Sequence, residues 1–306
     1  MEAARTQSGP WSIGRLLTWT RDYLQERSIE SPRLCAEILL AHALGCERIK
    51  LYTQYEAEPG PDVLDRFRAS VREAAAGQPI AYLTGTKEFF SLPFEVNPDV
   101  LIPRPETEIL VERTIDLVRH SGGSLRSILD LGTGSGCIAV SLARHLPDVR
   151  VFASDVLDAA LAVARRNAER HGVAERIRFA RGDLFEPWRD MPATGAAPFD
   201  VIVCNPPYLA TAPGTPLDRA VRCEPAVAVF AGTDGLDIIR RVVATAPRWL
   251  TAGGHLLLEM AFDQATALRA LLDRQYWEDI VTYRDGASHE RVVQARCGRA
   301  AQVQVA

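Results

Sequence analysis

The sequence has 306 residues, of which 47% are hydrophobic, 24% are charged and 7% are aromatic, and its formal net charge is −4. This composition excludes intrinsic disorder as the main state and is sufficient for two modest domains. The near balance of 35 basic and 39 acidic residues disfavours an obligate nucleic-acid binder, since neutralising many phosphates requires a basic face.

No apolar run is long enough to span a membrane, and Gly14 and Arg15 interrupt the N-terminal apolar run where a secretory signal would continue it. The six cysteines form no C-x-x-C pair, and the six histidines show no metal-ligand spacing. We therefore expect a cytoplasmic protein without membrane association, a disulfide framework or a metal site.

The N-terminal part of the chain carries helix signals throughout. Ser31 and Pro32 predict an N-cap and a first helical position, and the helix that follows is expected to end at Gly45. A further helix is expected after Pro61. Because no catalytic grouping falls here, residues 1–80 are predicted to form a small all-helical domain that packs against the rest or docks a substrate.

Residues 81–105 differ in composition, with prolines, glycines and short alternating apolar pieces. Glu88–Ser91 and Pro93–Val96 predict a β-hairpin, and Pro105 is expected to open the next helix. The high apolar content predicts a structured connector that packs against another part of the protein.

From residue 106 onward, strands and helices alternate. This predicts an α/β domain over residues 106–298, with a mostly parallel seven-stranded sheet covered on both faces. The last two strands lack an intervening helix, so one of them is expected to be antiparallel at the edge. Residues 299–306 are expected to form a frayed tail. The predicted strands are 127–131, 149–154, 177–180, 199–204, 255–260, 279–283 and 291–296, and the predicted helices are 137–145, 158–171, 235–250 and 262–272.

A glycine-rich loop follows the first of these strands, and its residues are Gly132, Thr133, Gly134, Ser135 and Gly136. Glycine at alternate positions lets a strand turn into a helix while a ligand lies against bare backbone. Cys137 stands where a dinucleotide fingerprint has its third glycine, which disfavours a nucleotide-dependent oxidoreductase. Taken alone, the loop is also compatible with an ordinary strand–helix turn.

Acidic residues at neighbouring strand ends indicate the ligand. Asp155 ends the second strand, where it can accept hydrogen bonds from both ribose hydroxyls. Asp183 and Leu184 follow the third strand and are placed to bracket the edge and face of an adenine. Asp130, just before the loop, can face a cationic group. We infer that the ligand is S-adenosylmethionine, lying across the carboxyl ends of the strands.

The strand 199–204 runs directly into Asn205, Pro206, Pro207 and Tyr208. The prolines fix the backbone, so the Pro206 carbonyl and the Asn205 side-chain oxygen become rigid acceptors for both hydrogens of a planar NH₂ group. Tyr208 is expected to stack on that group. A nitrogen held in this way is positioned for in-line methyl transfer without a metal or a covalent nucleophile. The predicted catalytic residues are Asn205, Pro206 and Tyr208, and Pro207 completes the substrate-binding segment.

Three segments together resemble the HemK/PrmC-type glutamine N5-methyltransferases: the loop DLGTGSGCIA, the tetrapeptide NPPY and the connector PIAYLTGTKEF…VLIPRPETEILVE. NPPY is shared with adenine-N6 DNA methyltransferases, whereas the IPRPETE segment is more specific. The resemblance covers about residues 10–297. It implies a helical N-terminal domain, a Rossmann-like catalytic domain, and a substrate glutamine in the Gly-Gly-Gln tripeptide of class-1 peptide chain release factors.

The resemblance also implies roles for individual residues. It implies contacts with S-adenosylmethionine from Gly132–Gly136, Asp155, Leu184 and Asn205. It implies that Asn205–Tyr208 hold the glutamine amide, that Arg104 and Glu106 clamp the two domains together, and that Phe89 or Phe90 approaches the methyl donor.

The sequence departs from the family pattern at four places. Ser91 replaces the usual glycine of the hairpin, Ala220 stands in a stretch that usually carries an acidic residue, and Ala261 replaces another glycine. A usually short segment is lengthened over Gly286–Arg291. All four lie where a protein substrate can dock, so they bear on the partner rather than on the reaction.

Three alternatives remain at this point: a ribosomal-protein glutamine methyltransferase, an adenine-N6 enzyme, and a non-catalytic module that binds S-adenosylmethionine. The chain offers no separate target-recognition domain and no basic surplus, which disfavours duplex DNA. The intact NPPY tetrapeptide disfavours a non-catalytic module. We expect a monomer without stable nucleic-acid binding, whose partner is a class-1 release factor.

Overall fold

The computed structural model describes residues 11–191, 199–211 and 219–298. The chain divides into two compact units, Met1–Gly85 and Thr86–Ala306, and the division falls inside the predicted connector. Within the described ranges, no helix has the length and apolar character needed to cross a membrane.

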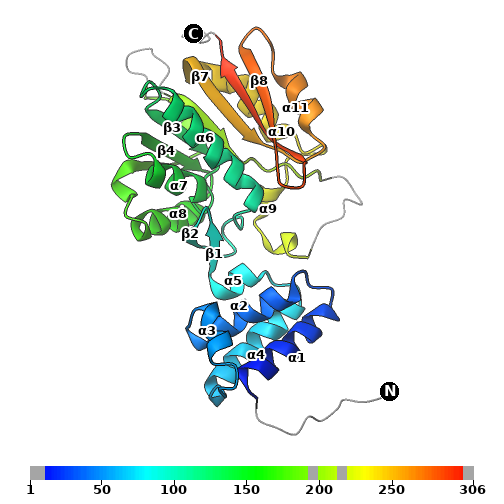
Figure 1. The fold of residues 1–306 in the computed structure, drawn as a ribbon. Coiled ribbons are helices and arrows are strands. Elements are labelled where there is room, and N and C mark those ends of the chain that lie inside the picture. The colour runs from blue at the N-terminus through cyan, green and yellow to red at the C-terminus, as the bar shows by residue number, and fades with distance from the viewer. Residues whose placement is uncertain (1–10, 192–198, 212–218, 299–306) are drawn as a thin grey trace. The chain divides into compact units, whose positions relative to one another are not determined.

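The first unit is built from helices (Figure 1). Pro32 and Pro61 occupy the first positions of two of them, and Gly45 ends a helix with a left-handed φ of 64°, as the sequence predicts. Ser31 does not cap with its side chain, because its φ of 49° is left-handed whereas side-chain capping requires an extended residue. The helices are α1 (Ile13–Gln25), α2 (Pro32–Leu44), α3 (Arg48–Thr53), α4 (Pro61–Ala75) and α5 (Ile80–Thr84).

The helical unit has a hydrophobic core of its own. Leu24 of α1, Leu39 and Leu40 of α2, and Phe67 of α4 are at most 1% exposed and belong to one cluster. Each such side chain contributes about 1.5–3 kcal/mol when it is fully buried. Burial therefore holds α1, α2 and α4 together.

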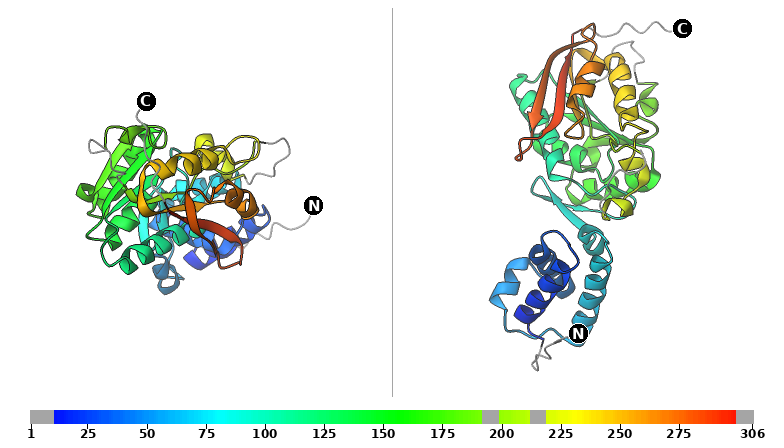
Figure 2. Two further views of the ribbon diagram at one scale, coloured as in Figure 1. Left: turned by 90° about the horizontal axis from the view of Figure 1, so that it is seen from above. Right: turned by 90° about the vertical axis from the view of Figure 1, so that its right-hand side faces the viewer.

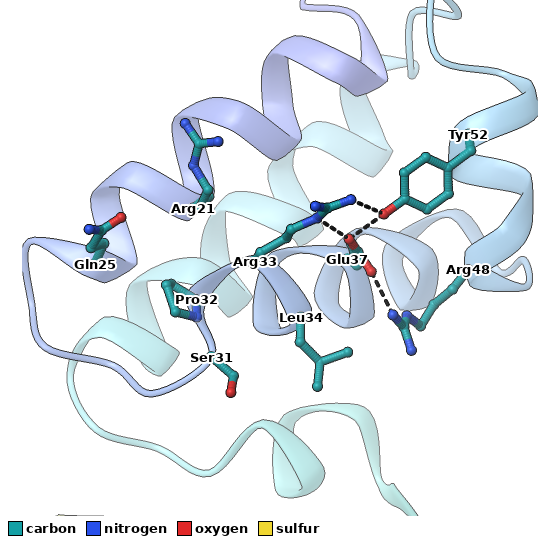
Figure 3. Close-up of a pocket in the computed structure, with 9 residues that line it drawn as sticks. All are labelled: Arg21, Gln25, Ser31, Pro32, Arg33, Leu34, Glu37, Arg48 and Tyr52. Atoms are coloured by element: carbon teal, nitrogen blue, oxygen red, sulfur yellow. Dashed lines mark hydrogen bonds and ion pairs between the residues drawn. The ribbon is translucent and has the colours of Figure 1, made fainter.

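A buried carboxylate joins α2 to α3. The Glu37 side chain is 5% exposed, and Figure 3 shows it among Arg33 of its own helix and Arg48 and Tyr52 of α3. Arg48 Nη2 donates to Glu37 Oε2 at 2.6 Å and Arg33 Nε donates to Oε1 at 3.0 Å, while the Tyr52 hydroxyl also donates to Oε1. These residues line a surface pocket of about 460 Å³.

The Glu37 cluster is electrostatically favourable. Burial by itself would raise the pKa of the Glu37 carboxyl, but hydrogen bonds from Tyr52, Arg48 and Arg33 outweigh it and lower the pKa below its ordinary value. Because α3 has only 6 residues, it is too short to be stable alone, and this charged contact helps to fix it.

The second unit begins with the predicted hairpin and continues into a seven-stranded sheet. The hairpin strands are β1 (Thr86–Phe89) and β2 (Leu92–Glu95), and the sheet strands are β3 (Ser127–Leu131), β4 (Arg150–Asp155), β5 (Ile177–Arg181), β6 (Phe199–Cys204), β7 (Leu250–Glu259), β8 (Trp277–Arg284) and β9 (Glu290–Cys297). The helices are α6 (Glu108–His120), α7 (Cys137–His145), α8 (Asp158–Arg170), α9 (Ala226–Val229), α10 (Asp237–Thr245) and α11 (Ala265–Leu271). Short 3₁₀ turns are η1 (Pro105–Thr107), η2 (Ala174–Arg176), η3 (Glu186–Trp188), η4 (Val221–Cys223) and η5 (Ala246–Arg248).

The strand order is β5-β4-β3-β6-β7-β9-β8. Neighbours from β5 to β7 are parallel, and β9 is antiparallel to both β7 and β8. The prediction of one antiparallel strand is confirmed, but its placement at the edge is wrong. The edge strand is β8, and the antiparallel strand β9 lies between β7 and β8. The physical reason is burial: Val292, Val293 and Ala295 of β9 are at most 1% exposed, whereas β8 carries exposed residues along its length.

Helices cover both faces of the sheet (Figures 1 and 2). In the central strand β6, Val201 and Val203 belong to the cluster that contains α6, α7 and the hairpin. Ile202 and Cys204, which point the other way, belong to the cluster with α10 and α11. Successive side chains of a strand alternate between faces, so a strand buried on both sides is apolar at every position.

One predicted helix is too long. The prediction of a helix over residues 235–250 fails at its end, where α10 stops at Thr245, the turn η5 contains Pro247, and Leu250 already belongs to β7. Proline provides no N–H for an α-helical hydrogen bond, so the helix ends before it. The tail predicted over residues 299–306 lies outside the described residues.

We expect Glu37→Gln to lower the free energy of unfolding by about 2 kcal/mol at neutral pH, the size of a hydrogen bond to a charged group. Because folding lowers the pKa of this carboxyl, its contribution is present above the unfolded value of about 4.3 and is lost as the pH falls through the folded value. Thermal unfolding followed by circular dichroism across pH measures the difference. Glu73→Gln, at an exposed position of α4, is the control; equal changes in both variants, or a difference that persists in acid, would contradict the interpretation.

Candidate functional site

A cavity of about 450 Å³ lies where the parallel strands end. Residues that follow β3, β4, β5 and β6 line it together, since the carboxyl ends of parallel strands meet at one edge of a sheet. Of the residues predicted to bind a ligand, those lining the cavity are Gly132, Gly134, Asp155, Asp183, Leu184, Asn205 and Pro207. The other predicted residues, Thr133, Ser135, Gly136, Pro206 and Tyr208, are not among those lining it in the described part of the chain.

The glycines of the loop after β3 have two different tasks. All three have left-handed φ values, and a Cβ at Gly132 or Gly134 would meet nothing within 4 Å. A Cβ at Gly136 would lie 3.1 Å from the backbone of Ala164 in α8. The first two glycines therefore leave space on the cavity side, and the third allows close packing of two helices.

Asp155, at the end of β4, is held by the loop that it faces. Its Oδ2 accepts a hydrogen bond from the Gly134 N–H at 2.9 Å, and its Oδ1 accepts one from the Leu157 N–H at 3.0 Å. Burial raises the pKa of this carboxyl, and the backbone N–H groups act in the opposite direction. Each carboxylate oxygen keeps a further lone pair for a ligand hydroxyl.

Asp130, just before the glycine loop, is a buried acid with a missing partner. Its Oδ2 accepts a hydrogen bond from the Thr133 hydroxyl at 2.7 Å, but its Oδ1 has no partner among the described residues. Burial raises the pKa of this carboxyl to about 7. Asp130 is fully buried and is not among the residues that line the cavity, so it can favour a cationic ligand there through its charge rather than by direct contact.

Asp183 and Leu184 line the same cavity after β5. Asp183 forms an ion pair with Arg241 of α10, which also lines the cavity. Sequence reasoning missed Arg241, because nothing in its local pattern marks it as facing a site. A ligand that hydrogen-bonds to the Asp183 carboxylate would therefore share this carboxylate with the Arg241 guanidinium.

Asn205 carries the most informative polar atoms of the site. Its Nδ2 donates a hydrogen bond to the Thr107 hydroxyl at 3.0 Å. Its Oδ1 is buried and has no partner among the described residues. The amide is thus anchored through its nitrogen and offers its oxygen as an unused acceptor beside the cavity.

The other residues of the NPPY segment are held by contacts outside the cavity. Pro206 is buried, and no described residue donates a hydrogen bond to its carbonyl. The Tyr208 carbonyl accepts a hydrogen bond from Gln264 Nε2 at 3.0 Å, and a Cβ at Gly235 would approach this oxygen to 2.2 Å. Burial raises the pKa of the Tyr208 phenol, so the ring is neutral. Gln264 therefore fixes the backbone of the NPPY segment.

The connector forms one wall of the cavity, through Asp99, Val100 and Leu101. The sequence predicts that this apolar segment is packed against something but does not identify these residues as lining a site. A buried carboxylate holds the connector in place: Glu224 accepts hydrogen bonds from the Ile102 N–H at 3.0 Å and from Arg104 Nη2 at 2.6 Å.

One expectation drawn from the resemblance is wrong for this chain, whereas the clamp by Arg104 and Glu106 stays a prediction. Arg104 pairs with Glu224 of its own unit, and Glu106 forms no ion pair within the described residues. Phe89 and Phe90 do not approach the cavity: Phe89 is 1% exposed in the core, and Phe90 packs edge-on against His145 of α7. Both rings are apolar and lie beside core helices, so they pack in or against the hydrophobic core instead of lining the cavity.

The positions that depart from the family pattern have plain structural settings. Phe90 and Ser91 form the hairpin turn with φ values of 49° and 59°, a conformation that glycine adopts more easily. The Ala261 N–H donates to Gln264 Oε1 at 3.1 Å. Gly286–Arg291 spans the turn into β9, where the Arg291 Nε donates to Asp285 Oδ2 at 2.8 Å.

Known families and proteins match both units. The PrmC N-terminal domain model matches residues 15–85, and the Methyltransferase small domain model matches residues 107–217. Among solved structures, the hMettl16 catalytic domain in complex with MAT2A 3'UTR hairpin 6 aligns with a TM-score of 0.52 at 19% identity, over 74% of this chain and 81% of that one. This likeness supports the fold.

Sequence relatives extend over almost the whole chain. A release factor glutamine methyltransferase of Geobacter sulfurreducens is 41% identical over 289 residues, which cover 94% of this chain and 98% of that protein. One from Rhodopirellula baltica is 39% identical over 298 residues, covering 95% and 98%. Since this identity spans both the helical unit and the sheet that carries the cavity, the chain belongs to the release factor glutamine methyltransferase family.

Proposed function

We propose that this enzyme transfers a methyl group from S-adenosylmethionine to the N5 amide nitrogen of a glutamine, and that this glutamine is that of the Gly-Gly-Gln motif in a class-1 peptide chain release factor. The observation that carries the proposal is the buried, unpartnered Oδ1 of Asn205 at the edge of the cavity. Relatives named release factor glutamine methyltransferases support the choice of substrate.

The cavity fits S-adenosylmethionine by its donors, acceptors and free space. Gly132 and Gly134 leave room against the backbone, and Asp155 offers free lone pairs for the ribose hydroxyls. Asp183 and Leu184 would hold the adenine, and the charge of Asp130, which is buried outside the cavity lining, favours the positive end of the ligand. When bound, the cofactor supplies an electrophilic methyl carbon attached to a sulfonium.

The NPPY segment would hold the substrate amide. An amide nitrogen is a poor nucleophile because its lone pair is delocalised over the carbonyl. If Asn205 Oδ1 and the Pro206 carbonyl each accept one N–H, the nitrogen is fixed with its lone pair directed away from both acceptors. Tyr208 would stack on the amide plane and exclude water. Positioning and preorganised acceptors then lower the barrier, without a protein nucleophile.

The proposal includes the setting in which the enzyme works. We infer a cytoplasmic monomer, because the substrate acts where translation terminates, and we expect neither membrane association nor stable nucleic-acid binding. The near balance of 35 basic and 39 acidic residues agrees with a protein substrate.

Incubation of the enzyme with methyl-labelled S-adenosylmethionine and, in parallel, purified class-1 release factor, ribosomes or DNA tests the function. We expect label on the glutamine of the Gly-Gly-Gln peptide, located by mass spectrometry. A release factor in which that glutamine is replaced by glutamate is the control. Label on ribosomal protein or on adenine, with none on the release factor, would replace the proposed substrate.

Asn205→Ala should lower kcat by about 10²–10³-fold, the scale observed when one preorganised polar group is lost from a site. The dissociation constant of S-adenosylmethionine, measured by calorimetry, should change much less. Asp155→Ala provides the contrast, since it should weaken cofactor binding instead. Full activity of the Asn205 variant would remove the proposed role of the NPPY segment.

The affinity for S-adenosylmethionine should fall as the pH is lowered from about 8 to about 6. The pKa of Asp130 is raised to about 7 in the free protein, and a cationic ligand favours the charged carboxylate, so binding must release a proton below this pH. The limiting slope is about tenfold in affinity per pH unit. Calorimetry in two buffers of different ionisation enthalpy counts the protons, and Asp130→Asn is the control because it keeps the acceptor but does not titrate. An identical pH profile in Asp130→Asn would show that another group is responsible.

A further inference from the structure

Asn205 is connected to two buried polar side chains that no part of the proposed chemistry uses directly. Thr107 belongs to the turn η1, and Glu259 is the last residue of β7; each is 1% exposed. The Thr107 hydroxyl accepts a hydrogen bond from Asn205 Nδ2 at 3.0 Å, and its interaction with the Glu259 carboxyl lowers the pKa of that group. Three segments far apart in the sequence thus meet at this hydroxyl.

The directions of these hydrogen bonds are determined by chemistry. A hydroxyl has one proton to donate, and an ionised carboxylate can only accept, so Thr107 donates to Glu259 when that carboxyl is ionised. Burial raises the pKa of Glu259 to about 7, so this direction is set above that pH. The threonine oxygen must then accept from its other neighbour, which selects the Nδ2 of Asn205 at 3.0 Å. Oδ1 of Asn205 is consequently turned to the opposite side. Reversal of the carboxamide would set its oxygen against the oxygen of Thr107.

The sheet makes this arrangement rigid. In the parallel pairing of β6 with β7, Cys204 lies opposite Leu258, so the next residues, Asn205 and Glu259, follow side by side at the ends of two central strands. Pro105 opens the turn η1 that supplies Thr107. Strand register and connector geometry therefore bring the three side chains together, and a rotation of the Asn205 amide is the main freedom left.

Burial of the Glu259 carboxylate costs desolvation free energy, which a purely structural role does not explain. It forms no ion pair within the described residues, and its Oε2 has no hydrogen-bond partner there. An apolar residue at such a position would usually stabilise the fold more. What the carboxylate supplies, and an apolar side chain cannot, is a defined direction for the Thr107 proton.

We propose that Thr107 and Glu259 are positioning residues for methyl transfer: the Glu259 carboxylate sets the direction of the Thr107 hydroxyl, and this hydroxyl holds the Asn205 amide with its oxygen toward the substrate nitrogen. The proposal rests on the proposed function, because it deepens the role given there to Asn205. Neither residue is among those lining the cavity, so both are proposed to act through Asn205.

Thr107→Val removes the hydroxyl while keeping the shape of the side chain. We expect kcat to fall about tenfold or more, the effect of a small loss of alignment at the reacting group, with KM for the release factor and the cofactor dissociation constant changed less than about twofold. Thr107→Ser restores the hydroxyl and should restore kcat. Thr114→Val is the matched control, since Thr114 is a fully buried threonine of α6 whose hydroxyl donates to the Leu110 carbonyl and, among the described residues, to no other group. The kcat of this variant should equal that of the wild type.

A double-mutant cycle separates positioning from general stability. If Thr107 acts only through Asn205, then Thr107→Val should cost nothing further in an Asn205→Ala background. Should Thr107→Val fail to fold in a thermal melt, Glu259→Gln takes its place in the same cycle, because its amide can donate to Thr107 and reverse the hydrogen-bond directions. Additive losses, an unchanged kcat, or no recovery in Thr107→Ser would overturn the proposal. Failure of the wild-type enzyme to methylate any glutamine would instead refute the proposed function, so the two failures are distinguishable.

Discussion

The candidate active site depends on the orientation of a single, partly buried carboxamide, that of Asn205. Asn205 follows the central strand β6, and two prolines come after it, so its backbone has little freedom. The two ends of its amide have similar shapes but opposite hydrogen-bonding properties. The Thr107 hydroxyl takes the nitrogen end, and the oxygen end is left unsatisfied. Protein folding thus fixes which chemistry a ligand meets at this point.

The distribution of satisfied and unsatisfied polar atoms divides the cavity into two regions. Where we propose that ribose and adenine bind, both oxygens of Asp155 bond to backbone N–H groups and Asp183 is paired with Arg241. At Asn205, by contrast, a buried oxygen has no partner among the described residues, and the same holds for one oxygen of Asp130, which is fully buried and does not line the cavity. Buried polar atoms are rarely left unsatisfied in native proteins, because each costs about 1–3 kcal/mol. The unsatisfied region around Asn205 is therefore where we place the methyl donor and the accepting amide.

The connector belongs to the machinery of the site and does more than join two units. Its segment around Val100 forms a cavity wall, and Thr107, just beyond it in the turn η1, holds Asn205. Glu224 fixes it by accepting from the Ile102 backbone and from Arg104. Burial raises the pKa of Glu224, while the charge of Arg104 and the hydrogen bonds lower it. A family-specific sequence in this connector is understandable, because it supplies contacts that no strand end can provide.

The sequence by itself determined the fold class, the sheet and the residues at the strand ends, because hydrophobic alternation and glycine or proline positions act locally. It also named Asp155 and Asn205, since each directly follows a strand that its composition reveals. Only the tertiary structure decided which atoms of those residues lack a hydrogen-bond partner among the described residues. It also decided that β9 lies between β7 and β8 and that Phe89 packs in the core. Those outcomes depend on contacts between residues distant in the chain, such as Thr107 with Asn205, and no local pattern encodes the partner of a hydrogen bond.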